Sequence, residues 1–181
     1  MYCSSCGSET DSPTCVVCGH TNATGTTNPK STIDSVTGLA LAGWLRRVGA
    51  TFADGLVMVI PILIAESVVA AAAGTVDGVI AGLIVQGAYM IKMLSGPKGQ
   101  TVGNRVAATR VRDAVTGLQI TNIQALKRWG VVAVYGLLSL NRSIGTSIVL
   151  IIGLVDYLWP LFDKRNQTLH DKFAGTIVVL A

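Results

Sequence analysis

Long apolar runs, separated by short polar segments, dominate the chain after residue 43. The first run covers about 48–73, the second about 79–94, and the last clear one 144–162. A run of about 20 mostly apolar residues is what a helix needs to cross a bilayer. The pattern therefore predicts an all-α integral membrane protein.

A further apolar run, residues 126–140, is short, and Asn141-Arg142-Ser143 separates it from the last run. Basic residues gather in the loop 95–128 and in the tail after residue 162, and basic segments beside membrane helices stay on the cytoplasmic side. If both segments are cytoplasmic, an even number of crossings separates them. We therefore expect about four transmembrane helices, with both termini inside. The alternative is three, with 126–140 lying along the membrane surface.

Composition agrees with a membrane location. Half of the residues are hydrophobic, 13% are charged and the mean hydropathy is +0.55. A soluble domain carries about 25% charged residues. The net charge of +4 comes from basic residues beside the apolar runs, so we expect membrane lipids rather than nucleic acid as partners, in the cell membrane.

Two CxxC motifs contain every cysteine of the chain: Cys3, Cys6, Cys15 and Cys18. Residues 1–29 are polar and lack the apolar core of a signal peptide, so we expect a cytoplasmic N-terminus, where thiols stay reduced. Four thiolates form the closed tetrahedral ligand set of a structural Zn²⁺ site. A small zinc ribbon over residues 1–21 is therefore predicted, able to contact a protein partner. A disulfide pair or a redox CxxC is the alternative.

The polar segments predict further organisation. Small polar residues over 22–43 predict a flexible linker, which leaves 44–181 as the membrane domain. In the basic loop, residues 109–113 and 118–121 alternate in polarity around Ala114-Val-Thr-Gly117. This alternation predicts a small β-hairpin at the membrane surface.

Charged residues inside the apolar runs are the candidate functional positions, because a charge within a bilayer is costly and marks a packed or functional site. Arg47 and Asp54 fall on one face of the first helix, about 10 Å apart along its axis. Glu66 lies about 120° around that helix from Asp54. Asp156 lies in the last run.

Three motifs within 43–181 resemble the RDD family of bacterial and archaeal membrane proteins. They are Arg47-x-x-Ala50-x-x-x-Asp54, Gly99-Gln-Thr-x-Gly103 and Asn166-Gln-Thr-Leu-His-Asp171-Lys-x-Ala-Gly-Thr-x-Val178. The resemblance places the family arginine on Arg47, the first aspartate on Asp54 and the second on Asp171. It implies an RDD-type transmembrane domain over 44–181. Cation–proton exchange has been proposed for some members, and the role is otherwise undefined.

Two functional hypotheses follow. In the first, the protein has a structural, assembly or sensing role: Arg47, Asp54 and Asp171 clasp helix ends at the cytoplasmic face. In the second, Asp54, Glu66 and Asp156 carry a small cation or proton across the membrane. Four short spans make a small path, so a pore would require a homo-oligomer. No catalytic constellation is present in the sequence, and we expect no enzyme activity.

Overall fold

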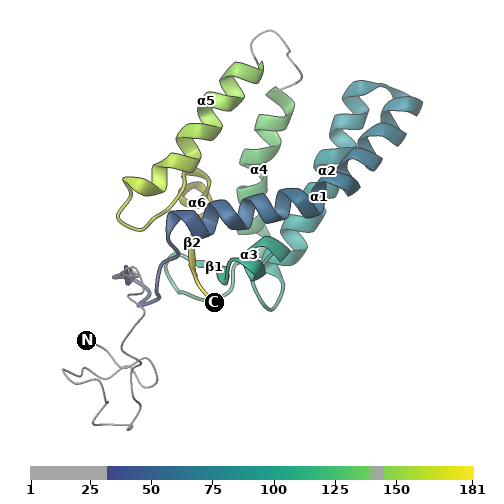
Figure 1. Ribbon diagram of the computed structural model, residues 1–181. Coiled ribbons are helices and arrows are strands. Elements are labelled where there is room, and N and C mark those ends of the chain that lie inside the picture. Colours follow the sequence, from purple (N-terminus) through teal and green to yellow (C-terminus); the bar gives the residue numbers. More distant parts are fainter. Residues whose placement is uncertain (1–31, 139, 141–144) are drawn as a thin grey trace, which may run out of the picture. The chain divides into compact units, whose positions relative to one another are not determined.

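A computed structural model describes residues 32–138, 140 and 145–181 (Figure 1). The predicted zinc ribbon, with its four cysteines, and residues 22–31 of the expected linker lie outside these described residues. The described part is mostly helical. Its longest helices are α1 (Trp44–Ala73), α2 (Thr75–Ser95), α4 (Asn122–Leu138) and α5 (Gly145–Leu158).

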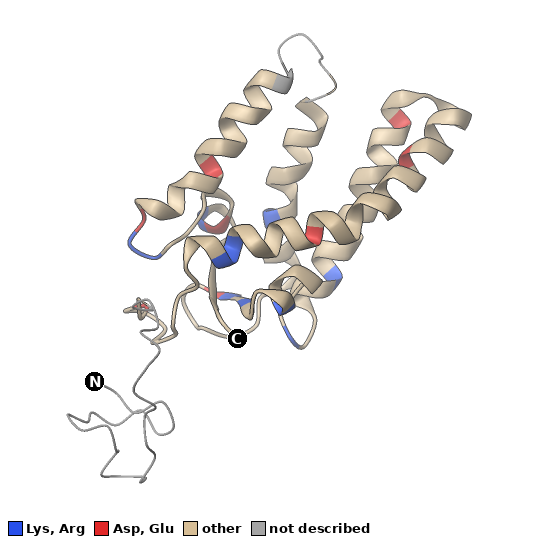
Figure 2. Cartoon of the chain, viewed as in Figure 1, with Lys and Arg blue, Asp and Glu red and all other residues tan. Residues whose placement is uncertain are grey.

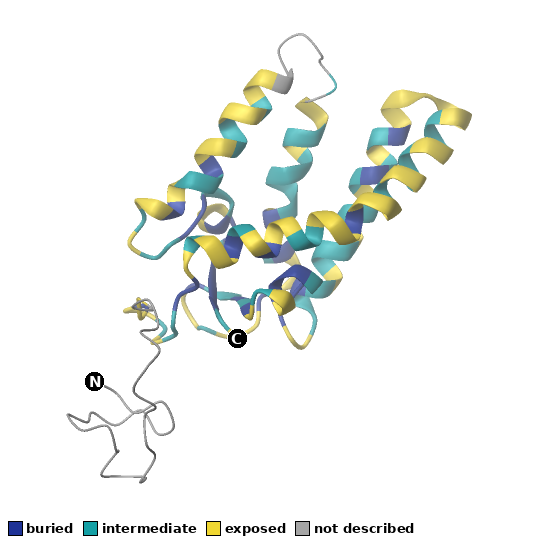
Figure 3. Ribbon diagram, viewed as in Figure 1, coloured by how far each residue is buried: buried dark blue, intermediate teal, exposed yellow. Residues whose placement is uncertain are grey.

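Among the described residues, α1 with 30 residues and α2 with 21 are long and apolar enough to cross a membrane. Charged residues are sparse along both helices (Figure 2). Most large apolar side chains of α1 are exposed (Figure 3). They are Leu45, Phe52, Leu56, Val57, Val59, Ile60, Leu63, Ile64 and Val68. Water disfavours an apolar surface of this extent, whereas lipid accommodates it.

Helices also occupy the two further expected spans. α4, with 17 residues, covers most of 126–140, and α5, with 14 residues, lies within 144–162. A single 3₁₀ turn, Trp159–Leu161, continues directly from α5. Both helices are shorter than α1 and α2, so helix length by itself does not fix the number of crossings.

Small residues bring the long helices close together. Gly74 is the only residue between α1 and α2, so α2 begins at Thr75, earlier than the expected residue 79. A Cβ on Gly78 would lie 2.8 Å from the Ala70 Cβ, and a Cβ on Gly87 would lie 2.7 Å from the Trp129 ring of α4. Glycine therefore permits α2 to touch α1 on one side and α4 on another.

A two-stranded antiparallel sheet joins distant parts of the chain. Strand β1 (Thr109–Asp113) pairs with β2 (Thr176–Leu180) near the C-terminus. The expected hairpin between 109–113 and 118–121 is therefore wrong, and the domain is not purely α-helical. The physical reason is burial: Ile177 and Val179 of β2 are 0% and 2% exposed, while Leu118 remains 69% exposed. β2 thus removes more apolar surface from water than the local partner would.

Residues 32–43 fold against this sheet, so the flexible linker expected over 22–43 does not extend through them. Leu41 forms a β-bridge with Val179 and is 2% exposed. Arg165 donates to both carboxylate oxygens of Asp34, from Nε at 2.7 Å and from Nη2 at 2.8 Å. These hydrogen bonds lower the pKa of Asp34 to about 2. The residues around Leu41 therefore pair with β2 in a strand-like conformation and do not form a flexible linker.

Two short helices complete the described part and hold the candidate site. Helix α3 (Val102–Val106) begins at the N-cap Thr101, whose side chain accepts a hydrogen bond from the Asn104 amide. Helix α6 (Leu169–Ala174) begins with a capping box and ends at Gly175, which has a φ of 66°. Contacts of α3 with α1 and of α6 with α4 connect the sheet region to the long helices.

Candidate functional site: two carboxylates beside one cavity

Asp171 is the centre of a buried charge cluster. It is fully buried and forms ion pairs with Arg47 of α1 and Arg128 of α4. The two arginines are 7% and 8% exposed. Arg47 also donates to the Asn166 carbonyl oxygen at 2.6 Å, and Arg128 donates to the Thr176 hydroxyl at 2.6 Å. We call Arg47, Arg128 and Asp171 the Asp171 cluster. It joins α1, α4 and α6.

The local sequence around Asp171 explains its position. Asp171 occupies the third position of α6, where its carboxylate accepts from the Thr168 amide at 3.1 Å. The Thr168 hydroxyl accepts in return from the Asp171 amide at 3.1 Å. This reciprocal capping box fixes the position of the Asp171 carboxylate independently of its ion pairs with the arginines. One side chain therefore both starts α6 and forms ion pairs with two buried guanidinium groups.

His170 extends the cluster to α5. Asp156, 1% exposed, accepts from the His170 amide at 3.0 Å and contacts His170 Nδ1 at 2.6 Å. Burial lowers the pKa of His170, against the opposing effect of Asp156, so the imidazole is neutral at pH 7. A neutral ring donates from Nδ1 to Asp156 and accepts at Nε2 from Arg128 Nη2, 3.3 Å away.

Asp54 holds the segment that leads into α3. Its carboxylate accepts from the Tyr89 hydroxyl at 2.6 Å, the Thr101 hydroxyl at 2.6 Å and the Gly103 amide at 2.8 Å. A Cβ on Gly103 would overlap the carbonyl oxygen of Ala50 and lie 2.7 Å from Asp54 Cγ. Two of the sequence motifs therefore meet: Ala50 and Asp54 of the first contact Thr101 and Gly103 of the second.

The structure separates the residues expected to form one clasp. Arg47 and Asp171 contact each other, while Asp54 has no hydrogen bond or ion pair with either of them in the described part of the chain. The second partner of Asp171 is Arg128. The one-face arrangement on α1 is present, since Arg47 and Ala50 are buried and Met58 continues the same stripe.

The three carboxylates of the expected cation or proton site also lie in different surroundings. Asp54 binds the α3 segment and Asp156 binds His170. Glu66 faces α2, where a Cβ on Gly82 would lie 2.5 Å from its Oε1. Within residues 32–138, 140 and 145–181, no three His, Cys, Asp or Glu side chains are grouped as a metal site requires.

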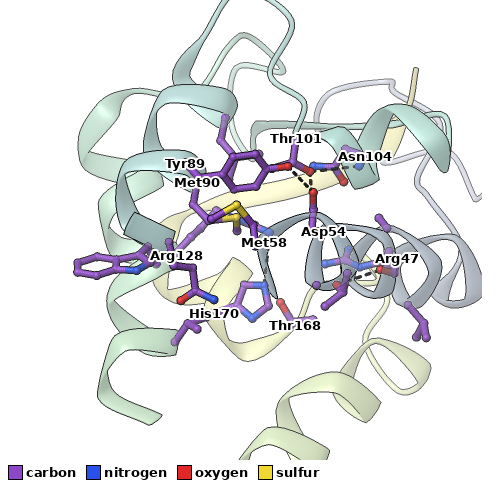
Figure 4. Close-up of a pocket in the computed structure, with 18 of the residues that line it drawn as sticks. Arg47, Asp54, Met58, Tyr89, Met90, Thr101, Asn104, Arg128, Thr168 and His170 are labelled. Atoms are coloured by element: carbon purple, nitrogen blue, oxygen red, sulfur yellow. Dashed lines mark hydrogen bonds between the residues drawn. The ribbon is translucent and has the colours of Figure 1, made fainter. Parts of the chain in front are cut away.

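A cavity of about 410 Å³ is lined both by the arginines of the Asp171 cluster and by Asp54 (Figure 4). Arg47, Arg128 and His170 line it from the Asp171 side, and Asp54 lines it from the α3 side. Much of the remaining wall is apolar and comes from α1, α2 and α4. The arrangement offers charged hydrogen-bond donors next to a surface suited to hydrocarbon.

Arg128 is the functional residue that sequence reasoning missed. In the sequence, Lys127-Arg128 reads as the positive end of a cytoplasmic loop. In the structure, α4 begins six residues earlier, at Asn122, so Arg128 lies within the helix. It shares a buried face with Ala125, three positions before it, which is 0% exposed. In the sequence, the only signal is the spacing of three positions from the apolar Ala125, and it becomes informative once the start of α4 is known.

Comparison with known proteins gives one match. Residues 41–175, which are 135 of the 181 residues, match the RDD family. Neither the curated proteins nor the solved structures gave a match. The matched region contains the Asp171 cluster and all the contacts of Asp54. The chain therefore belongs to the RDD family of membrane proteins.

Proposed function

We propose that this chain is a membrane-anchored assembly or sensing protein. Its RDD domain is a firmly held scaffold, and its N-terminal zinc ribbon contacts a protein partner at the cytoplasmic face. The observation that supports this role is that the Asp171 and Asp54 carboxylates are bound to side chains and amides of neighbouring segments. Asp171 forms ion pairs with two arginines, and Asp54 accepts three hydrogen bonds, one from Tyr89 of α2 and two from the α3 segment. Charges engaged in this way hold segments together.

Strand pairing supports a four-span topology for this scaffold. β1 follows α2 and β2 follows α5, so their pairing supports a topology in which both segments lie on one side of the membrane. The bridge between Leu41 and Val179 supports the same side for the segment before α1. An even number of crossings must then separate these segments, which disfavours three spans. The 17 residues of α4 extend about 26 Å, close to the lower limit for a span.

Cysteine labelling in intact cells tests the topology. Ser143→Cys, placed between α4 and α5, and Thr75→Cys, at the start of α2 next to the α1–α2 turn, are expected to react with a membrane-impermeant maleimide. Lys98→Cys, in the basic loop, is expected to react only after permeabilisation. The unsubstituted chain gives the background from the native cysteines. Labelling of Ser143→Cys only after permeabilisation would rule out four spans.

Metal content and partner crosslinking test the role of the N-terminal segment. We expect about one zinc ion per chain, and a reproducible crosslinked protein partner in membranes. Cys15→Ser with Cys18→Ser should lose both, because two thiolates cannot hold a structural zinc ion. Ser4→Ala with Ser5→Ala, between the other two cysteines, is the matched control and should keep both. A double cysteine variant that retains its zinc or its partner contradicts the proposal.

Transport of a cation or proton receives less support from the geometry. Asp54, Glu66 and Asp156 face different neighbours, and no acidic cluster of three joins them in the described part of the chain. The carboxylate of Asp54 already accepts three hydrogen bonds, so few of its acceptor sites remain for a cation. The assembly or sensing role is therefore the function that we propose.

A further inference from the structure

Two residues that line the cavity between α1, α2 and α4 each have a buried N–H group without a hydrogen-bond acceptor among the described residues. Three buried side-chain nitrogen atoms lack a hydrogen-bond partner in the described residues: Arg110 Nε, Arg128 Nε and Trp129 Nε1. Arg128 and Trp129 are neighbours in α4, and both line the cavity, whereas Arg110 does not. A buried donor without an acceptor costs about 1–3 kcal/mol. The two unpaired donors therefore point to a missing ligand that supplies acceptor oxygens.

The rest of the cavity is suited to a hydrocarbon chain. Along α1 it extends from Arg47 to Leu63, sixteen positions or about 24 Å at the helical rise. Met58 and Ile62 line it beyond the charged end, and Val132 of α4 faces the same space. Leu63 is also 54% exposed, so the apolar end reaches the outer surface of α1. Its volume of about 410 Å³ is that of a small-ligand pocket.

The charge balance limits the head group. Arg47 and Arg128 share a single carboxylate, Asp171, while Asp156 accepts a hydrogen bond from the neutral His170 and keeps its negative charge. Asp54 also lines the cavity, and its negative charge disfavours a dianion such as a phosphate monoester. A carboxylate carries one charge and two acceptor oxygens, which matches two unpaired donors. It also gains most from a donor on a cationic guanidinium.

We propose that this cavity binds a long-chain fatty acid. Its carboxylate accepts from Arg128 Nε and Trp129 Nε1, and its chain lies along Met58, Ile62 and Val132. The site goes beyond the assembly or sensing role and does not depend on it. Zinc content and partner crosslinking stay informative whatever the result for fatty acid.

Photocrosslinking of the full chain in lipid nanodiscs tests the site. A palmitate that carries a diazirine near its chain end should crosslink to peptides of α1 or α4. Unlabelled palmitate should compete at least about tenfold better than hexadecanol, because the alcohol lacks the charged head that strengthens the hydrogen bonds. Equal competition by hexadecanol would overturn the assignment of a carboxylate head.

Two variants with matched controls test the position of the ligand. Ile62→Trp fills the apolar part and should lower crosslinking at least about fivefold, whereas Ile60→Trp, on the exposed face of α1, should leave it unchanged. Trp129→Phe removes the indole N–H together with part of the ring and should weaken palmitate about tenfold, while Trp159→Phe, the same change outside the cavity, should not. Each variant must first be shown to elute as a folded protein, so that lost crosslinking reflects the cavity and not misfolding. Unchanged crosslinking in Trp129→Phe, or in folded Ile62→Trp, would overturn the proposal.

Discussion

Asp171→Asn is expected to lower the free energy of unfolding of the membrane domain by about 3–5 kcal/mol, the cost of breaking a buried ion pair from one side. The asparagine has nearly the same shape but no charge. Arg47 and Arg128, both less than a tenth exposed, would then remain charged and buried without a counter-ion. The N-terminus of α6 would lose a charged cap at the same time. Unfolding of the purified full chain in detergent measures the loss.

Asp77→Asn provides the matched control. Asp77 is also an aspartate in the first turn of a helix, but it is exposed and has no ion pair among the described residues. Its substitution should change the unfolding free energy by less than about 1 kcal/mol. Replacing the whole cluster, as Arg47→Met, Arg128→Met and Asp171→Leu, should restore much of the stability that Asp171→Asn removes, because no charge is left unpaired. Similar losses for Asp77→Asn and Asp171→Asn would contradict the importance of the cluster.

Gly103→Ala is expected to be the most damaging change that adds a single methyl group. The new Cβ would overlap the Ala50 carbonyl oxygen, which belongs to the backbone of α1 and cannot rotate away. The α3 segment must then move off α1, and the hydrogen bond from the Gly103 amide to Asp54 is lost. Overpacking costs about 1–3 kcal/mol and a lost hydrogen bond to a charged group a further 1.5–3 kcal/mol, roughly.

The effect of Gly103→Ala can be measured as a shift in thermal unfolding and as faster amide hydrogen exchange over α3. Gly130→Ala in α4 is the control, because no atom lies within 4 Å of the Cβ it would add. Alanine should be neutral or slightly stabilising there, since it is the better helix former. A Gly103→Ala chain as stable as the Gly130→Ala chain would mean that α3 does not pack on α1 at this point.

The long helices could be predicted from the sequence because their signal is local. Each expected span overlaps a helix, and the face shared by Arg47, Ala50 and Asp54 follows from the helical period alone. The resemblance to the RDD family rested on three motifs, and all but the last three residues of the third lie within residues 41–175, the region that the family match covers. Local patterns of this kind require no knowledge of the tertiary contacts.

The contacts between distant segments could not be predicted in the same way. β1 and β2 are more than 60 residues apart, and periodicity favours the nearby residues 118–121 as the partner of β1. The choice depends on which partner buries more apolar surface, which is a property of the folded domain. Arg128 was missed for a related reason: the same residue reads as a loop charge until the start of α4 is known.

The two family aspartates have different partners in the described structure. Asp171 binds arginines that come from two other helices, while Asp54 binds the segment that carries Thr101 and Gly103. Asp171 therefore connects α1, α4 and α6, and Asp54 fixes α3 on the side of α1. Residues of both attachments line the cavity. Its shape depends on both carboxylates, although they do not contact each other.

A pair of double-mutant cycles tests most directly whether Arg47 interacts with Asp171 and not with Asp54. One cycle combines Arg47→Met with Asp171→Asn, and the other combines Arg47→Met with Asp54→Asn, each measured as free energy of unfolding of the full chain. Residues in contact couple by about 0.5–3 kcal/mol, and distant ones by less than about 0.5 kcal/mol. We predict a coupling above about 1 kcal/mol for Arg47 with Asp171 and below about 0.5 kcal/mol for Arg47 with Asp54. Equal couplings, or a larger one with Asp54, would contradict the separation of the two carboxylates.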